Sequence, residues 1–598
     1  MGTLSEQEVR EYTSQPAFRT PAISSRATRR SVPDDIWRSL EMIPGLITWS
    51  ILIGSVVFSY FAPLYVAYAI LIFDVYWLVK SVSMSHGLIR AYRLLKRDMA
   101  VDWHGSVTSL GRSIDQHLQR IDGQIADLTG GRRGLPLAAW HIRTSLLDRR
   151  CLREYRSLLA ERALIARSAG TEGGAIPVGE VYHLVVVATY TEELDILRPS
   201  FQALVDAQYD HSRMIVVLAT EQRDHDRAQA NARVLKAEFG QKFRRFIVTE
   251  HPSDIVGETK GKGANISWAG RQAIKEIDNL KIPHDRVIVT SLDADHRPHP
   301  QYFAAVSYRY VLEPDRKHLS FQPTPLFHNN LWYTAAINRV IATGSSFWHM
   351  VESTRAYRLR NFAAHSQGLE AVLATDWWSV DTIVEDGQQF WRTYFAFSGR
   401  HFVVPIYVPV YQDAVLGETY SKTLSGQYIQ LRRWAWGASD FPYIVINAWR
   451  DKHIPIGNKI TQITRFLEGH IMWAVAPILL TFVGLLPALL SKEFHDSLFG
   501  QNFAPTASLI LTTALIGIVI TIFISLLLLP PKPPGYKARH RVLMLLQWGL
   551  MPITTILFSS LPAIESQTRL MFGKYLEFRV TEKAARPLRR TAAKSEQA

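Results

Sequence analysis

Long uncharged apolar segments alternate with polar ones along this chain, and they indicate which parts lie in a membrane. Residues 42–73 carry no charge and are interrupted only by Ala62-Pro63. This pattern predicts a helical hairpin, Ile43–Phe61 and Leu64–Val79, in which each helix is long enough to cross about 30 Å of hydrocarbon. Asp74 lies near Lys80 and is expected to be hydrated at the interface. Three more uncharged blocks follow, at 469–491, 497–531 and 542–564.

Lys and Arg residues near the apolar blocks predict the topology, because cytoplasmic flanks are enriched in them. Both ends of the first hairpin are basic, so both ends and the long central region are predicted to be cytoplasmic. The last block, 542–564, has basic residues on both sides and Pro552 in its middle. It is therefore expected to lie at, or dip into, the inner interface. The prediction is a multi-pass protein of the plasma membrane with four crossings and one interfacial helix.

Between the apolar blocks, the chain shows the alternating strands and helices of an α/β domain. Four short apolar runs rich in β-branched residues predict buried parallel strands: His183–Ala188, Met214–Ala219, Phe246–Val248 and Val287–Ser291. Segments of helical character, such as Thr191–Gln208, separate them. The fold class is therefore a Rossmann-like, mostly parallel α/β sheet inserted between transmembrane helices. Ligands of such sheets collect at the carboxyl ends of the strands, here just after Ala188, Ala219 and Ser291.

These patterns divide the chain into seven parts. We expect a basic cytosolic segment (1–41), a transmembrane hairpin (42–80), a helical cytosolic linker region (81–180), the α/β domain (181–450), an amphipathic region with two transmembrane helices (451–531), an interfacial or re-entrant helix (532–575) and a basic tail (576–598).

The chain is basic, with 67 Lys and Arg against 53 Asp and Glu, a net charge of +14 and a pI near 9.6. Such a charge suits either a nucleic-acid binder or a membrane protein with basic inner loops. The basic residues concentrate at the membrane flanks, so we expect no nucleic-acid partner. The single cysteine, Cys151, excludes a disulfide scaffold and multi-cysteine metal sites.

Two acidic residues, Asp293 and Asp295, follow the predicted strand that ends at Ser291. Carboxylates in this position can bind a hard divalent cation, Mg²⁺ or Mn²⁺, which in turn can bind a diphosphate. Acidic residues separated by one position are common by chance, and the location at a strand end is what makes this pair a candidate. Upstream, Lys262 lies between Gly261 and Gly263 at the start of a probable helix. It is either a phosphate-binding lysine or part of an ordinary helix start.

Two further motifs lie later in the domain. Glu385 and Asp386 follow a Trp-rich turn and could supply a general base with a neighbouring charge that tunes its pKa; a solvated acidic helix start is the alternative. Gln430, Arg433 and Trp434 share one face of a predicted helix. Arg can neutralise a diphosphate and Trp can support a sugar ring. An amphipathic helix docked under the membrane helices is the alternative there.

Taken in order, these motifs resemble those of the processive, membrane-embedded family 2 glycosyltransferases, the cellulose, chitin and hyaluronan synthases. The residues 188–192 are similar to that family's Pro-Ser-Tyr-Asn-Glu start, and 293–296 resemble its metal and diphosphate motif. The pair 385–386 resembles its Thr-Glu-Asp motif, and 430–434 match Gln-x-x-Arg-Trp. Residues 578–583 resemble the Phe-x-Val-Thr-x-Lys gating loop of the bacterial cellulose synthase catalytic subunit.

The resemblance implies a GT-A-type hexosyltransferase that inverts the anomeric centre of a nucleotide sugar, with a UDP-sugar expected. Asp386 is then the base, with Glu385 beside it, and Asp293 and Asp295 hold Mg²⁺ or Mn²⁺. Residues implied to contact the nucleotide sugar are Thr189, Tyr190, Glu192, Glu221, Lys262, Asp293, Arg433, Thr581 and Lys583. Residues implied to contact the acceptor are Gln430 and Trp434. The implied product is a growing β-linked polysaccharide, whose export could be coupled to its synthesis; a single transfer to a lipid-linked acceptor is the alternative.

The sequence departs from the family pattern at three places. Thr220-Glu221-Gln222 stands where the family has Asp-Asp-Gly, which leaves the nucleobase preference open. Ala364-His365-Ser366 stands where the family has a Gly-Ser pair lining the acceptor site. The arginines at 586–590 superficially resemble a cyclic-di-GMP-binding PilZ motif, but only a short tail follows Lys583. We expect a basic membrane-facing tail there.

Overall fold

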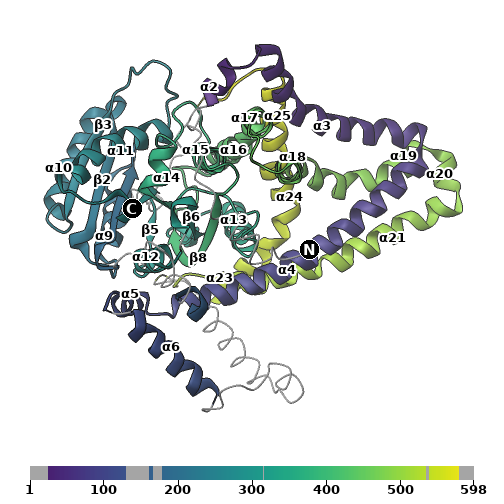
Figure 1. Ribbon diagram of the computed structural model, residues 1–598. Helices are drawn as coiled ribbons and strands as arrows, with labels where there is room; N and C mark the ends of the chain where they lie inside the picture. The colour runs from purple at the N-terminus through teal and green to yellow at the C-terminus, as the bar shows by residue number, and fades with distance from the viewer. Residues whose placement is uncertain are drawn as a thin grey trace, which may run out of the picture.

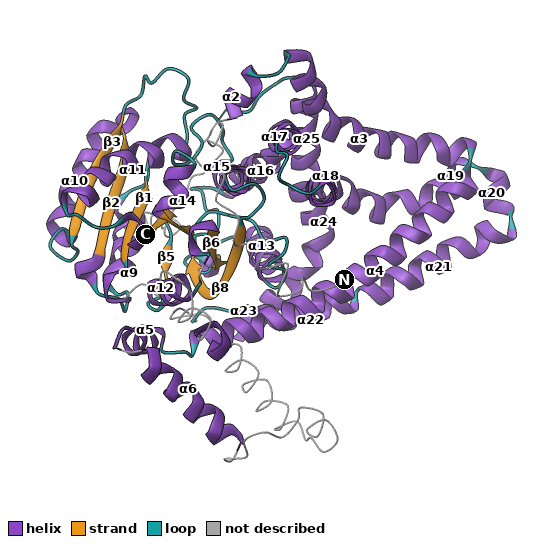
Figure 2. Cartoon of the chain, viewed as in Figure 1, coloured by secondary structure: helices purple, strands orange, loops and turns teal. Residues whose placement is uncertain are grey.

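The computed structural model describes residues 25–112, 114–129, 161–165, 178–313, 315–531, 533 and 538–577. An α/β domain built from the middle of the chain lies beside long helices contributed by both halves of the sequence (Figures 1 and 2). The fold class predicted from the sequence is thereby confirmed: a mixed, mostly parallel sheet is flanked by long apolar helices.

The sheet has eight strands in the order β3-β2-β1-β4-β7-β6-β8-β5. Its parallel half contains the four strands that the sequence predicts: β1 (Tyr182–Ala188), β2 (Met214–Glu221), β3 (Arg245–His251) and β4 (Val287–Asp293). The other half contains the short β5 (Arg297–Pro298), β6 (Leu319–Leu326), β7 (His365–Gly368) and β8 (Phe402–Tyr411). Strand β7 runs antiparallel to both β4 and β6, so it joins the two halves.

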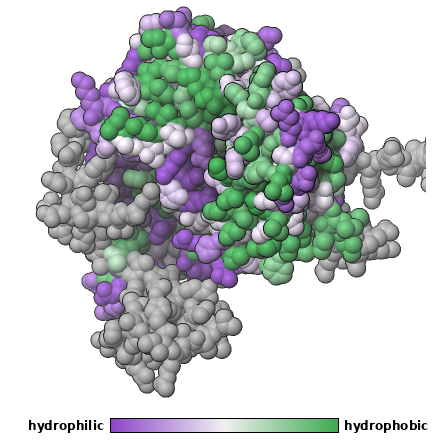
Figure 3. All heavy atoms as spheres, turned by 90° about the vertical axis from the view of Figure 1, so that its right-hand side faces the viewer, coloured by the Kyte–Doolittle hydropathy of each residue, from purple (hydrophilic) through white to green (hydrophobic). Residues whose placement is uncertain are grey.

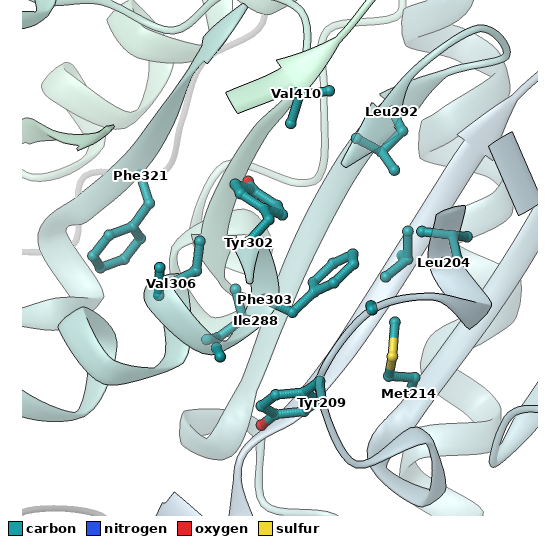
Figure 4. Close-up of a cluster of buried hydrophobic side chains, with 14 of the residues drawn as sticks. Leu204, Tyr209, Met214, Ile288, Leu292, Tyr302, Phe303, Val306, Phe321 and Val410 are labelled. Carbon is teal, nitrogen blue, oxygen red and sulfur yellow. The ribbon is translucent and has the colours of Figure 1, made fainter. Parts of the chain in front are cut away.

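Alternate residues of each central strand face opposite sides of the sheet. In β1, Val185 and Val187 pack into one core cluster, whereas Leu184 and Val186 pack into another. The first cluster lies under α9 (Leu194–Val205), α10 (His225–Phe239) and α12 (Tyr302–Leu312), and Figure 4 shows part of it. The second lies under α11 (Lys262–Asn279) and α14 (Leu369–Ala374). Both faces are covered, which explains why the strand residues are almost all apolar.

Four more helices connect this domain to the rest of the protein. Helix α15 (Glu385–Ala396) and helix α16 (Tyr420–Ala435) carry two of the sequence motifs, and α13 (Ala336–Ser353) and α17 (Phe441–Arg450) pack near the long helices. Shorter helices precede the sheet along the chain: α2 (Ser25–Arg30), α5 (Trp103–Arg112) and α6 (Ile114–Thr129).

Within the residues that the structure describes, five helical segments are long and apolar enough to cross a membrane. They are α3 (Asp34–Phe61), α4 (Pro63–Met99), 456–490 with α18 (Ile456–Phe482) and α19 (Leu486–Leu490), 498–527 with α21 (Leu498–Ala514) and α22 (Ile516–Leu527), and 542–571. The short α20 (Lys492–Asp496) lies between the third and fourth segments. Large apolar side chains are exposed along these helices, including Phe61, Tyr65, Ile72, Leu509 and Val519.

Figure 3 looks at the molecule from the right-hand side of Figure 1 and shows broad hydrophobic areas on that face. Exposed apolar area of this extent is rare on proteins that stay in water, and it matches contact with lipid tails.

The segment 542–571 differs from the other four in direction. It consists of the end of α23 (Ala538–Leu546), α24 (Met551–Thr555), a π-helical turn and α25 (Leu561–Met571). In Figure 1, α24 and α25 run next to the α/β domain, across the direction of α3, and α25 packs against α3 and α18. Glu565 on α25 accepts hydrogen bonds from Tyr428 and Arg432 of α16. The segment is long and apolar enough to span a membrane, and the interfacial position expected from its basic flanks stays a prediction.

The structure contradicts one expectation about the hairpin. Asp74 was expected to be hydrated near the interface, yet its side chain on α4 is buried, with 2% of the residue exposed. The charge pattern could not reveal this, because burial comes from helices that are distant in the sequence; α21 packs along α4.

Candidate active site

The carboxyl ends of the parallel strands carry the polar groups that the sequence places there. After β1, Glu192 folds back on its own turn: its Oε2 accepts hydrogen bonds from the Thr189 hydroxyl (3.0 Å) and from the Tyr190 backbone N–H (2.8 Å). The Thr189 N–H donates to the Ala219 carbonyl of β2 at 2.9 Å. These bonds fix the turn that leaves β1 and the position of the Tyr190 ring beside it.

Glu221, the last residue of β2, is buried and paired with an arginine. Arg223 Nε donates to Glu221 Oε2 at 2.7 Å, and the same guanidinium lies 4.4 Å from the centre of the Tyr190 ring. Burial raises the pKa of Glu221, while the charge and hydrogen bonds of Arg223 oppose that shift. The ends of β1 and β2 thus share a carboxylate, a guanidinium and an aromatic face, a combination suited to a planar, hydrogen-bonding group.

Helix α11 is tied to this edge of the sheet by Asn265. Its amide donates to the carbonyl oxygens of Ala219 (2.9 Å) and Thr189 (3.3 Å). Two residues earlier, Gly263 packs so closely that a Cβ there would lie 2.2 Å from the Ser379 carbonyl oxygen and 2.9 Å from Glu385 Cβ. A glycine is therefore required, and it lets the start of α11 lie directly against α15.

Lys262, the first residue of α11, lies between two of the predicted acidic groups. Its Nζ is 2.7 Å from Asp293 Oδ1 and 3.1 Å from Asp386 Oδ2. Burial would lower the pKa of this ammonium, but the charges of Asp293, Asp386 and Glu385 outweigh burial and raise it. Lys262 is therefore cationic at every physiological pH, and it joins the end of β4 to the start of α15.

Asp293, Asp295 and His296 form a compact group at the end of β4, with one candidate ligand atom from each within 4.8 Å of the others. The Asp413 backbone N–H donates to Asp295 Oδ2 at 2.8 Å and holds that carboxylate in place. The backbone N–H of Asp293 donates to His296 Nδ1, which leaves the ring proton on Nε2. Nδ1 is engaged by this hydrogen bond, and the two carboxylates are the oxygen ligands that suit a hard cation such as Mg²⁺ or Mn²⁺.

Glu385 and Asp386 begin helix α15, where the helix dipole favours negative charge. They differ in exposure: Glu385 is 2% exposed, whereas 17% of the Asp386 side chain is accessible. Burial, followed by the charge of Asp386, raises the pKa of Glu385 to about 7, against the opposing charges of Lys262 and Arg433. Of the two carboxylates, Asp386 is the one that a second molecule can reach.

The third motif lies on α16, on the membrane side of the site. Arg433 is close enough for its charge to act on Glu385. The Trp434 ring lies 6.4 Å from the Phe327 ring, in an apolar cluster that includes Leu529 beyond the end of α22. Gln430 is 8% exposed. Trp434 thus lies where the α/β domain meets the membrane helices.

The predicted site residues fall into three neighbouring groups. Thr189, Tyr190, Glu192 and Glu221 meet at the ends of β1 and β2. Lys262, Asp293, Asp295, Glu385, Asp386 and Arg433 meet between β4, α11, α15 and α16. Trp434 lies in the apolar cluster with Phe327 and Leu529, and Gln430 lies one turn before it on α16, where it accepts a hydrogen bond from Gln427. Thr581 and Lys583, with the rest of the gating-like motif, lie outside the described residues.

Four further residues shape the site but were not among the predicted ones: Arg223, Asn265, His365 and Asp413. Asn265 could have been predicted from the sequence. It lies about one turn into a helix that begins at Gly-Lys-Gly, where an amide side chain can donate to the free carbonyl oxygens at strand ends. The others contact the site from the loop after β2, from β7 and from beyond β8. The proximity of His365 and Asp413 depends on the strand order, which the sequence pattern does not reveal, whereas Arg223 pairs locally with Glu221.

No family model matches the chain, and no curated protein is similar to it in sequence. Solved structures similar to it include the mannosyltransferase PcManGT from Pyrobaculum calidifontis in complex with GDP-Man and Mn²⁺, with 14% identity and a TM-score of 0.32. TarS residues 1–349 from S. aureus in complex with UDP-GlcNAc is another, with 13% identity and a TM-score of 0.32. Each match covers 67% of this chain and 94% of the other.

Proposed function

We propose that this protein is a membrane-bound, inverting glycosyltransferase of GT-A type that uses a nucleotide sugar, with a UDP-sugar expected. The observation that carries this proposal is the contact of Lys262 with both Asp293 and Asp386. Through this contact Asp293, a candidate ligand for the cation that binds the diphosphate, lies within a few ångströms of the accessible carboxylate of Asp386. A displacement at a sugar carbon needs this proximity, because the leaving diphosphate and the attacking hydroxyl lie on opposite sides of the same atom.

Asp386 is proposed to accept the proton of the acceptor hydroxyl as the hydroxyl attacks the anomeric carbon. One direct displacement converts an α-linked donor into a β-glycoside. Arg433 and Lys262 supply positive charge beside the site, and such charge stabilises the diphosphate as the sugar leaves. Glu385 is too buried to contact the acceptor, so its proposed role is to adjust the charge around Asp386.

Asp293 and Asp295 would hold the divalent cation, Mg²⁺ or Mn²⁺. The bound cation would supply Lewis-acid charge to the diphosphate of the donor. Asp295 is suited to this role because the Asp413 N–H already orients its carboxylate. At the neighbouring strand ends, Tyr190 and the Glu221–Arg223 pair would hold the nucleobase.

The acceptor is proposed to approach from the membrane side, where Trp434 lies next to Phe327 and Leu529. A growing β-linked polysaccharide is the acceptor that the motif resemblance favours, and its export could follow along the membrane helices. A single transfer to a lipid-linked acceptor is the second candidate. It is favoured by the apolar surroundings of Trp434, which would suit a lipid close to the transferred sugar.

Product size separates these two functions. The full-length protein, purified in nanodiscs, would be incubated with a radiolabelled nucleotide sugar and Mn²⁺, and the labelled product would be sized by gel filtration and thin-layer chromatography. Long polymer supports polysaccharide synthesis. A product extracted into organic solvent and carrying one sugar supports the lipid-linked alternative and rejects processive synthesis.

A further inference from the structure

His365 is the first residue of β7, beside the strand that carries the acidic motif. Strand β7 pairs antiparallel with β4, and His365 lies opposite Ser291, two residues before Asp293. Ala364 enters the strand with a positive φ of 57°, which turns the chain sharply just before the histidine. This local turn and the strand pairing together place the imidazole inside the protein, where 0% of the residue is exposed.

The imidazole lies against the proposed base. His365 Nδ1 is 2.8 Å from the Phe362 carbonyl oxygen, to which it donates, and 3.9 Å from Asp386 Oδ1. Because a carbonyl oxygen can only accept a hydrogen bond, this contact fixes the proton on Nδ1. Burial lowers the pKa of His365, so the ring is neutral at physiological pH. The Trp378 ring, with its centre 5.6 Å away, packs against the imidazole and restricts its movement.

Asp386 therefore has a different neighbour on each side. Lys262 Nζ is 3.1 Å from Oδ2 and 3.3 Å from Oδ1, and the fixed imidazole of His365 is next to Oδ1. The ammonium attracts the carboxylate, and the buried imidazole lies 3.9 Å from its Oδ1 atom.

We propose that His365 is a positioning residue that holds the Asp386 carboxylate beside Lys262, in the orientation needed to accept a proton. This inference rests on the proposed role of Asp386 as the base. His365 does not contact the acceptor itself, since it is fully buried; it acts through Asp386. A displacement of about 1 Å at a reacting group can lower a rate by roughly 10²-fold, so the effect of losing this neighbour should be measurable.

The test compares three variants of the full-length protein in nanodiscs with Mn²⁺ and whichever of UDP-glucose, UDP-GlcNAc and GDP-mannose the wild type uses. His365→Ala should lower kcat by about 10- to 100-fold, in line with that misplacement effect, with the KM for the donor unchanged. His365→Asn should recover most of kcat, because its amide N–H can still donate to the Phe362 carbonyl. Equal kcat in wild type and His365→Ala, or no recovery by His365→Asn, would overturn the proposal.

His183→Ala is the matched control. His183 is another fully buried histidine of the same sheet, but it bonds to the Ser307 hydroxyl at 2.7 Å, on the face that α12 covers. Its loss should lower the melting temperature and leave the kcat of the folded protein unchanged. If His365→Ala fails to fold, His365→Gln replaces it. Gln places its amide near the Nε2 position and leaves the Phe362 carbonyl without its donor.

A cryo-EM structure of the His365→Ala or His365→Gln protein decides the inference even if the wild type transfers no sugar, an outcome that would reject only the proposed function. The proposal expects the Asp386 carboxylate to turn toward the vacated volume and to leave Lys262. An unchanged carboxylate at hydrogen-bond distance from Lys262 would show that His365 does not position it.

Discussion

The ammonium group of Lys262 lies 3.1 and 3.3 Å from the two carboxylate oxygens of Asp386, although 124 positions separate these residues in the sequence. Lys262 begins one helix of the α/β domain and Asp386 lies in the first turn of another. The same ammonium contacts Asp293 at the end of β4. Asp293 and Asp386 are therefore linked through Lys262 before any substrate binds. The proposed role of each group can be tested by its own substitution.

Asp295→Asn tests the proposed cation site. Asn keeps an oxygen that can accept the Asp413 N–H but removes the negative charge, so the fold should persist while Mn²⁺ binding and transfer are lost. Affinity for the donor nucleotide should fall as well. Circular dichroism, isothermal titration with Mn²⁺ and a transfer assay measure these effects. Wild-type activity that survives excess EDTA would refute the requirement for a cation.

Asp386→Asn tests the proposed base. The amide keeps the shape of the side chain but cannot take a proton, so kcat should fall by a factor of about 10² to 10⁴ while the donor still binds. Donor affinity is measured by titration of the nucleotide sugar in the absence of acceptor. If affinity and kcat fall together, Asp386 belongs to the donor site instead. Asp376→Asn, an exposed surface carboxylate bound to Arg271, is the control and should leave both unchanged.

Glu385→Gln tests the charge next to the base. The pKa of Glu385 is raised from the ordinary 4.5 to about 7, so the folded protein binds its proton more tightly than the unfolded chain does. This contribution to stability is complete below pH 4.5 and is lost as the pH rises through 7. The melting temperature of the wild type, relative to Glu385→Gln, should therefore fall between pH 5 and pH 8. Parallel curves for both proteins would show that Glu385 is not the titrating group.

Much of the parallel half of the sheet can be predicted from the sequence, whereas the other half cannot. Strands β1, β2 and β4 are runs of β-branched and apolar residues, which both covered faces of the sheet require. Strands β6 and β8 each contain two prolines, and β7 reads His-Ser-Gln-Gly, so none of them has the pattern of a buried strand. These three segments become strands because of their tertiary contacts, which the local sequence pattern does not specify.

The candidate site shows the same division. The carboxylates at the end of β4 and at the start of α15 could be predicted, because ligands of parallel sheets bind at strand ends and helix starts favour acidic residues. His365 and Asp413 reach the site through strand pairing and a loop. The departure from the family pattern at 364–366 marked the position of His365 but not its contact with Asp386, and no local pattern marked Asp413. The burial of Asp295 is also set by tertiary contacts: it follows the end of β4, yet the residue is 1% exposed.

Truncation after Leu576 tests the proposed gating segment. Residues 578–583 resemble a loop that closes over bound nucleotide, and Tyr575, just before them, is anchored by a hydrogen bond to Glu41 at 2.8 Å. The truncated protein should insert, fold and bind Mn²⁺ but lose nearly all transfer. Full transfer by the truncated protein would exclude a role for Thr581 and Lys583.

The same segment requires the end of the chain to be cytoplasmic. A cysteine introduced at Ser595 in a Cys151→Ser background should react with a membrane-impermeant maleimide only after the cells are opened. Labelling of intact cells would mean that 542–571 crosses the membrane, and the gating role would be withdrawn.

The central claim is that the group formed by Lys262, Asp293 and Asp386 transfers a sugar from a nucleotide sugar with inversion. The most direct measurement incubates the protein in nanodiscs with UDP-glucose, UDP-GlcNAc or GDP-mannose, total membrane lipid or β-glucan oligomers as acceptors, and Mn²⁺. Released nucleoside diphosphate is quantified, and the anomeric proton of the product is observed by NMR. The account predicts equal amounts of diphosphate and β-linked product with one donor, and neither in EDTA or with Asp386→Asn. An α-linked product, or transfer that is unaffected by Asp386→Asn, would contradict it.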